Sequence, residues 1–284
     1  MTTSTIPLAL RMTQAGMNAL GAVAPPLAGR WAFDLFRRPA RFPDPAWEAE
    51  IGRTAERRWH IPFGEGRLAA LAWGEGPVVL LAHGWSGRGT QLGAFVAPLV
   101  AQGYSVVAFD APAHGRSTGR RTNLYEVADS VRHVAQEVGP VAAVVAHSFG
   151  AVATTLALGD GMEAGGVAYL GPACRASQAV KGFAKQLGLT LPVELGLRGA
   201  LERSFGANVW LHTSAANVAR SLKVPALLIH DLEDREVPYR EAQILAHNWP
   251  GAQLHTTAGL GHRRILRDPE TVERVVSFVK NLGR

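Results

Sequence analysis

The sequence predicts an α/β fold: a mostly parallel, doubly wound sheet with a helical insertion and an N-terminal helical extension. Four short runs of residues are continuously apolar, which is typical of strands buried on both faces of a parallel sheet. Helix-like segments separate these runs, and such alternation predicts helices on both faces. The alternation lapses between residues 171 and 217 and then resumes, which indicates an insertion.

The first two predicted strands differ from the rest because they alternate apolar and polar residues. They cover 57–63 and 67–73 and are joined by Gly64-Glu65-Gly66, a hairpin-type turn. Alternation predicts an antiparallel pair with one face buried. We therefore expect this hairpin to lie beside the parallel strands.

The remaining elements follow in order along the chain. Buried strands are expected at 78–82, 105–109, 141–146 and 167–170, with helices at 91–102, 123–138 and 150–158. Helical patches at 177–187 and 194–205 precede a strand at 226–230, a helix at 239–247, a strand at 253–257 and a helix at 269–282. The expected domains are an extension at 1–50, a core at 51–171, an insertion at 172–216 and a second part of the core at 217–284.

Composition excludes several classes of protein. The 284 residues are 47% apolar and 18% charged, as in a compact globular protein. The formal charge is +6, but the basic residues are scattered and interleaved with acids, which disfavours nucleic-acid binding. Cys174 is the only cysteine, so neither an intrachain disulfide nor a thiolate zinc site can form, and it is expected to be buried filler.

Residues 1–50 read as a basic, weakly amphipathic segment with a proline-rich end. One interpretation is a helix lying across the main body. The other is an amphipathic anchor at an anionic surface or a partner, with weak membrane-surface contact through residues 1–42. The stretch 12–29 is too polar to span a bilayer and a poor match to a secretory signal. We expect a cytoplasmic protein, with export or a membrane-peripheral location as alternatives.

Ser148 follows a predicted strand directly and precedes a predicted helix. Such a tight turn pushes the hydroxyl out of the sheet and needs small neighbours, here Ala146 and Gly150. A serine that caps the helix is the alternative interpretation. The backbone N–H of Phe149 and that of Trp85, after His83-Gly84, could stabilise an oxyanion, while His83 itself is expected to be structural.

Acids and a histidine follow the last two predicted strands. Asp231, Glu233 and Asp234 all compete for the role of a carboxylate that orients a base, and a solvated charged loop is the alternative. His262 lies in a glycine-rich loop before the final helix, whereas the other histidines lie in strands, on helices or outside a motif. Serine, acid and histidine thus occur in this order, each after a strand, as in one particular fold.

From residue 57 onward the chain resembles the α/β-hydrolase family. Two further segments carry the resemblance: Phe109 to Ser117 looks like the loop after the fourth strand, and Asp234-Arg235-Glu236-Val237-Pro238 looks like the acid loop. The resemblance implies Ser148 as nucleophile, His262 as base and Asp234 as its partner. It also implies oxyanion-hole N–H groups from Trp85 and Phe149, and a cap at 172–216.

The resemblance implies a serine hydrolase that cleaves a carboxylic ester, thioester or related acyl bond through an acyl-enzyme. Dehalogenase and epoxide hydrolase relatives have Asp where this chain has Ser148, so those reactions are disfavoured. No cofactor or metal is implied, and the expected partner is a small acyl substrate of apolar character. An acyltransferase with the same triad and a non-catalytic binding protein of the same fold remain alternatives.

Overall fold

The computed structural model describes residues 8–283, which group into two compact units. The helical unit comprises Met1–Arg38 and Arg175–Thr213, and the sheet unit comprises Pro39–Cys174 and Ser214–Arg284. No helix of the described residues is long and apolar enough to cross a membrane.

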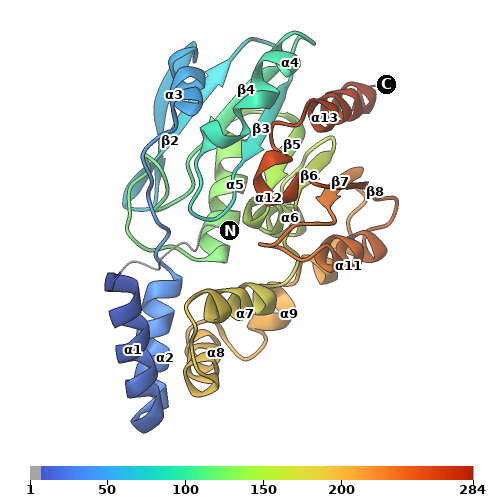
Figure 1. The fold of residues 1–284 in the computed structure, drawn as a ribbon. Coiled ribbons are helices and arrows are strands. Elements are labelled where there is room, and N and C mark those ends of the chain that lie inside the picture. Colours follow the sequence, from blue (N-terminus) through green and yellow to red (C-terminus); the bar gives the residue numbers. More distant parts are fainter. Residues whose placement is uncertain (1–7, 284) are drawn as a thin grey trace. The chain divides into compact units, whose positions relative to one another are not determined.

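The sheet unit is built on one eight-stranded sheet (Figure 1). The strands are β1 (Arg57–Phe63), β2 (Gly66–Trp73), β3 (Val78–Ala82), β4 (Ser105–Phe109), β5 (Val141–His147), β6 (Val167–Leu170), β7 (Ala226–Asp231) and β8 (Gln253–Thr257). Their order across the sheet is β1-β2-β4-β3-β5-β6-β7-β8. β1 and β2 pair antiparallel, β2 pairs antiparallel with β4, and β3 to β8 are mutually parallel. The carboxyl ends of the parallel strands therefore meet at one edge.

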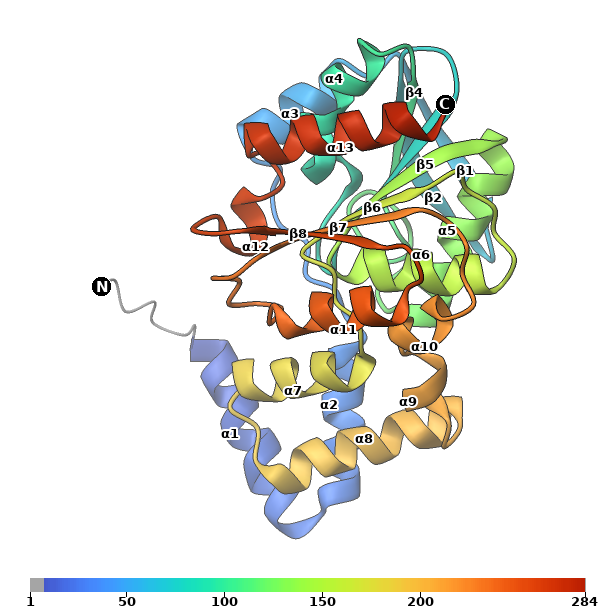
Figure 2. The same ribbon diagram turned by 90° about the vertical axis from the view of Figure 1, so that its right-hand side faces the viewer.

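Helices cover both faces of this sheet (Figure 2). One face packs against α5 (Leu124–Val138), α6 (Phe149–Gly159), α10 (Ala215–Ala219) and α11 (Arg240–Asn248). The other face packs against the 3₁₀ helix η1 (Gly89–Phe95), α4 (Val96–Val100) and α13 (Pro269–Leu282). Short α3 (Ala46–Arg53) and α12 (Gly261–Arg264) complete the unit. Both faces of the central strands are thus buried, which explains their continuously apolar sequences.

The helical unit consists of α1 (Leu8–Val23), α2 (Pro25–Phe36), α7 (Ala176–Gln186), α8 (Leu191–Phe205) and α9 (Val209–His212). α2 and α8 approach so closely at Gly29 and Gly196 that a Cβ on Gly29 would lie 2.1 Å from the Gly196 carbonyl carbon. Phe33 packs edge-on against Phe205, and Phe36 against Phe183. The N-terminal extension therefore packs against the helices of the segment after β6.

The fold class predicted from the sequence is confirmed, and each predicted strand is present. The segment at 91–102 differs from the prediction because it begins as a 3₁₀ helix, η1, before α4. We also placed residues 39–50 in the N-terminal extension, whereas they group with the sheet unit. Arg88 explains this grouping, since its guanidinium binds Asp44, lies 3.2 Å from Glu48 and donates to the Phe42 carbonyl.

Candidate active site

Ser148 occupies a strained turn between β5 and α6. Its φ of 52° and ψ of −114° lie outside the regions that non-glycine residues normally adopt. Gly150, two residues later, is required sterically, because a Cβ there would lie 2.4 Å from the Ala82 carbonyl oxygen and 2.5 Å from that of His83. β5 and α6 thus present a partly exposed serine on a tightly packed turn.

The loop after β3 lies against this turn. A Cβ on Gly84 would lie 3.2 Å from the Ser148 Cβ, and the rings of Trp85 and Phe149 are 5.1 Å apart in an edge-on arrangement. The structure therefore brings together the two residues whose N–H groups we predicted as oxyanion donors. Phe149 is the first residue of α6, where backbone N–H groups have no partner within the helix.

Asp234 and His262 are in direct contact, with the His262 Nδ1 2.6 Å from the Asp234 Oδ2. The other carboxylate oxygen accepts the N–H groups of Glu236 and Val237, both at 2.8 Å. Burial alone would raise the pKa of Asp234, but the hydrogen bonds from His230, His262 and the backbone outweigh it and hold the pKa well below its usual range. The carboxylate is therefore ionised and fixes the Nδ1–H tautomer of His262.

The other two candidate acids have different surroundings. The Asp231 carboxylate accepts the N–H groups of Glu233 and Leu260 and the hydroxyl of Thr257. Backbone hydrogen bonds, including one from Gly261, lower the pKa of Asp231 despite the opposing effect of desolvation. Asp231 thus anchors the loop that carries His262, and Glu233 is exposed.

Sequence reasoning missed His230, the residue before Asp231 at the end of β7. Its Nε2 lies 3.0 Å from the Val237 carbonyl oxygen and 3.3 Å from the Asp234 Oδ2. The Nε2–H therefore supports both the acid loop and the Asp234 carboxylate. No motif marks this histidine, because only the return of the loop to the strand end creates the contact.

His147, the residue before Ser148, contacts His262. Its ring is 4.5 Å from that of His262, and its Nε2–H donates to the His262 carbonyl oxygen at 3.1 Å. Burial, followed by the nearby His262, lowers the pKa of His147 well below its usual value, so the ring is neutral at pH 7. A buried neutral imidazole thus packs against His262, the candidate base.

His83 is held at both ring nitrogens, as expected of a structural residue. Nδ1–H donates to the Gly84 carbonyl oxygen, and Nε2 accepts the Ala111 N–H at 2.9 Å. Burial lowers the pKa of His83 to about 4. These bonds connect the loop after β3 with the loop after β4, next to the serine turn.

The loop after β6 touches both halves of the site. Leu170 accepts the Ser148 N–H at 3.0 Å, and a Cβ on Gly171 would lie 3.0 Å from the His262 Nδ1. The hydrogen bonds of the described residues do not include one between the Ser148 hydroxyl and the His262 ring. Such contacts commonly tighten only when substrate binds. The arrangement holds a hydroxyl, an imidazole and an ionised carboxylate at one sheet edge.

Comparisons with known proteins agree with this fold. A search of curated proteins finds no significant match. An esterase from Pyrococcus furiosus is similar in structure, with 20% identity, a TM-score of 0.66, and 86% of this chain and 97% of that chain covered. An esterase from Thermogutta terrifontis has 18% identity, a TM-score of 0.61 and 80% and 100% coverage.

A third similar structure is the thioesterase domain from the curacin biosynthetic pathway, with 17% identity, a TM-score of 0.58 and 79% and 99% coverage. The sequence pattern of the alpha/beta hydrolase family matches residues 78–275, which include every candidate site residue. The chain therefore belongs to the alpha/beta hydrolase family, and this membership supports a hydrolase activity.

Proposed function

We propose that this protein is a serine hydrolase that cleaves a carboxylic ester, thioester or related acyl bond through an acyl-enzyme on Ser148. The observation that carries the proposal is the strained backbone of Ser148, with φ 52°, at the sheet edge where Asp234 binds His262. The esterase and thioesterase folds found among similar structures are consistent with it.

In the proposed first step, the Ser148 Oγ attacks the substrate carbonyl carbon and transfers its proton to the His262 Nε2. Because the His262 Nδ1 is bound to Asp234, Nε2 is the nitrogen left to accept this proton. The carbonyl oxygen becomes an oxyanion, and the N–H groups of Trp85 and Phe149 stabilise it. The tetrahedral intermediate collapses as His262 returns the proton to the leaving group.

In the second step, water attacks the acyl-enzyme. His262 takes a proton from that water, a second oxyanion forms in the same hole, and the proton then passes to the Ser148 Oγ as the acid departs. The ionised Asp234 stabilises the imidazolium that forms in each step. The reaction needs no group beyond these side chains, two backbone N–H groups and water.

The test is turnover of p-nitrophenyl esters of increasing chain length by the wild type, Ser148→Ala and Ser86→Ala. Ser86 is the matched control, because it is a serine at positive φ in the neighbouring loop. We expect Ser148→Ala to lose at least about 10³-fold in kcat and Ser86→Ala to retain activity. Circular dichroism and the thermal midpoint check the fold of both variants.

An unchanged kcat in folded Ser148→Ala would contradict the proposal. If no ester is turned over by the wild type and no activated serine can be labelled, the proposed catalysis is wrong. Product analysis with an added alcohol separates the two acyl-transfer outcomes: mainly free acid supports hydrolysis, and mainly the new ester assigns the chain to acyltransferases.

A further inference from the structure

The exposed face of α1 is apolar, although surface helices normally expose polar residues. The exposed residues that repeat along this helix at intervals of three and four are Met12, Ala15, Gly16, Ala19, Ala22 and Val23. Arg11, one turn before Ala15, is also exposed, and it is the one charged or polar residue among the exposed residues from 11 to 23. The opposite side packs inside the helical unit, where Met17 is fully buried. Asn18, on the packed side, donates to the Gly188 carbonyl oxygen at 2.9 Å and accepts the Thr190 N–H at 3.0 Å. The polar side chains of α1 between residues 12 and 23 therefore face the unit, and apolar side chains are left exposed.

α2 extends this exposed surface. A Cβ on Gly16 would lie 3.4 Å from the Trp31 ring, so Trp31 borders the exposed face of α1. Trp31 is 39% exposed, and Leu27, one turn earlier on α2, is 52% exposed. We call the exposed face of α1 together with Leu27 and Trp31 the apolar hairpin face.

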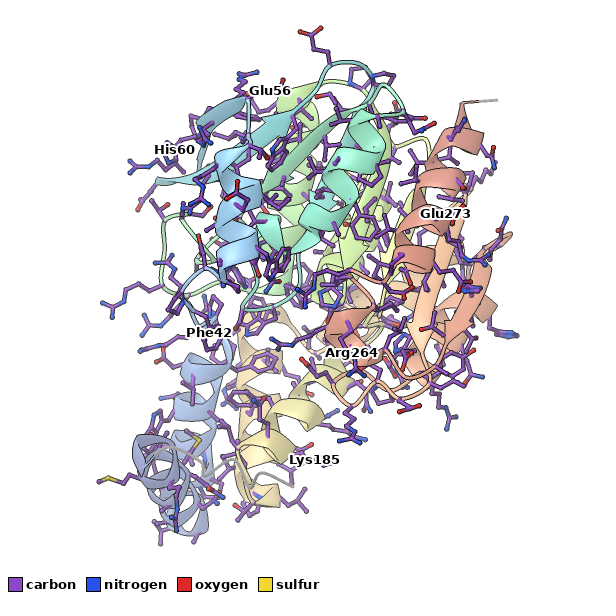
Figure 3. All side chains as sticks on the ribbon, turned by 45° about the horizontal axis from the view of Figure 1, so that its top comes forward. Phe42, Glu56, His60, Lys185, Arg264 and Glu273 are labelled. Atoms are coloured by element: carbon purple, nitrogen blue, oxygen red, sulfur yellow. The ribbon has the colours of Figure 1, made fainter. Side chains whose placement is uncertain are left out.

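The charges of the chain are divided unequally between the two units. The helical unit has nine basic and three acidic residues, a formal charge of +6, whereas the 20 basic and 20 acidic residues of the sheet unit cancel. Lys185 on α7 is one of the nine (Figure 3). Arg11 and Arg30 are exposed on the two helices of the apolar hairpin face, and residues 1–33 contain no acid. Asp34, the first acid, pairs with Arg38.

The exposed apolar side chains and the positive charge together favour one kind of partner for the apolar hairpin face. A second copy of the chain would bring another unit of charge +6 against the first, which opposes association. A nucleic acid would match the charge but leave the apolar side chains without partners. An anionic lipid surface satisfies both, since it attracts basic residues and accepts apolar side chains and tryptophan at the headgroup boundary.

We propose that the apolar hairpin face docks on an anionic phospholipid surface. Met12, Val23 and Leu27 insert at the boundary between headgroups and acyl chains, Trp31 lies at the interface, and Arg11 and Arg30 contact lipid phosphates. Because neither the apolar contacts nor the charges alone give stable binding, the two act together. The proposal is independent of the proposed hydrolase activity.

The experiment is sedimentation of the full chain with phosphatidylcholine vesicles and with vesicles that also contain phosphatidylglycerol, at low and high salt. We expect binding to the anionic vesicles only, weakened by salt. Met12→Gln with Leu27→Gln should reduce the partition coefficient at least about tenfold. Phe42→Gln is the matched apolar control, because Phe42 is 61% exposed in the sheet unit (Figure 3). It should bind as the wild type does.

Charge-reversal variants distinguish a direct contact between the apolar hairpin face and lipid from an effect of the net charge of the protein. Arg11→Glu with Arg30→Glu and Arg120→Glu with Lys280→Glu change the net charge equally. The first pair lies on the helices of the apolar hairpin face, and the second pair belongs to the sheet unit. We expect at least about 30-fold weaker binding for the first pair and a much smaller change for the second. Circular dichroism checks the folding of each exposed-site variant.

Three outcomes would overturn the proposal: no binding of the wild type to anionic vesicles, equal loss in both charge-reversal pairs, or no effect of the Met12 and Leu27 changes. A wild-type dimer in solution that Met12→Gln with Leu27→Gln converts to a monomer would assign the face to a second copy. Salt-sensitive binding to RNA that the first charge-reversal pair alone abolishes, without vesicle binding, would assign it to nucleic acid.

Discussion

The two units of this protein differ in how their polar and apolar side chains are partnered. In the sheet unit two acids at the end of β7 and in the loop after it have specific partners: Asp234 binds His262, and Asp231 binds Leu260 and Thr257. Its charges cancel. The helical unit holds its helices together through a glycine contact and aromatic pairs, and it leaves apolar side chains exposed and carries the whole net charge. The first unit holds the proposed catalytic site, and the second holds the proposed lipid-docking face.

The largest expected effect concerns the acid of the proposed triad. Asp234→Asn should lower kcat about 10³- to 10⁴-fold, because the amide cannot fix the His262 tautomer or stabilise its charged form. Binding to anionic vesicles, which we assign to the helical unit, should not change. Steady-state kinetics and vesicle sedimentation on the same sample check both expectations.

Asp231→Asn is the matched comparison, since this acid bonds the His262 loop but not the imidazole. Its kcat should fall much less than that of Asp234→Asn. Equal losses in the two variants would mean that the carboxylate of Asp234 has no special role.

The glycine contact of the helical unit should dominate its stability. Gly29→Ala places a methyl group against the backbone of Gly196, so we expect a loss of about 1 to 3 kcal/mol in the free energy of unfolding. Helix propensity alone predicts the opposite sign, a gain of up to about 1 kcal/mol.

Gly182→Ala in α7 is the control, because a Cβ there meets no atom within 4 Å. It should be neutral or stabilising in urea unfolding followed by circular dichroism. A stabilising Gly29→Ala would show that α2 and α8 are not held at the observed separation.

Acid should weaken the sheet unit through its buried histidines. Burial lowers the pKa of His83 to about 4 and that of His114 to about 3, and it also lowers the pKa of His147. Since the pKa of a histidine in the unfolded chain is about 6.5, the unfolded state binds more protons than the folded state below that pH. The contribution of these neutral histidines to the free energy of unfolding is complete above about pH 6.5. It is lost as the pH falls from about 6.5 toward the pKa values of the histidines in the folded state.

The free energy of unfolding should fall with decreasing pH by at most about 1.4 kcal/mol per pH unit for each histidine. Urea unfolding at pH 7.5, 6.5 and 5.5 measures this slope, and His114→Gln should make it shallower. A free energy of unfolding that rises as the pH falls from 6.5 would contradict buried neutral histidines.

Helix capping gives the smallest expected difference between the units. The Asp268 side chain accepts the N–H and hydroxyl of Thr271 at the start of α13, so Asp268→Ala should cost about 1 kcal/mol. The Thr190 side chain, before α8, forms no capping hydrogen bond, so Thr190→Ala should lower the free energy of unfolding by only a few tenths of about 1 kcal/mol. Thermal unfolding of both variants tests this, and equal losses would mean that the Asp268 cap contributes nothing.

The strands of the sheet could be predicted closely because the hydropathy of their residues follows their burial. Val78 to Ala82 and Val167 to Leu170 are apolar throughout because helices cover both faces, so sequence alone predicts their bounds. Motif and order also indicated Ser148 and His262, whereas the choice of Asp234 among three acids came from the resemblance to the α/β-hydrolase acid loop. The structure places Asp234 and His262 in contact. Their catalytic roles stay predictions until the variants are measured.

Other features depend on distant segments and leave no local pattern. His230 and His147 join the site only because loops return to the strand ends, and a strand sequence does not encode this return. The pairing of α2 with α8 brings together residues more than 150 positions apart in the chain. The division of charge between the units is visible only once the contacts define which segments belong together.

Whether Ser148 is an activated nucleophile is tested most directly by intact-mass spectrometry after reaction with a fluorophosphonate, followed by peptide mapping. The samples are the wild type, Ser148→Ala and Asp234→Asn. We expect one adduct per wild-type chain, located on Ser148, no adduct on Ser148→Ala and markedly slower labelling of Asp234→Asn. An adduct on another residue, or equal labelling of wild type and Ser148→Ala, would contradict this role of Ser148.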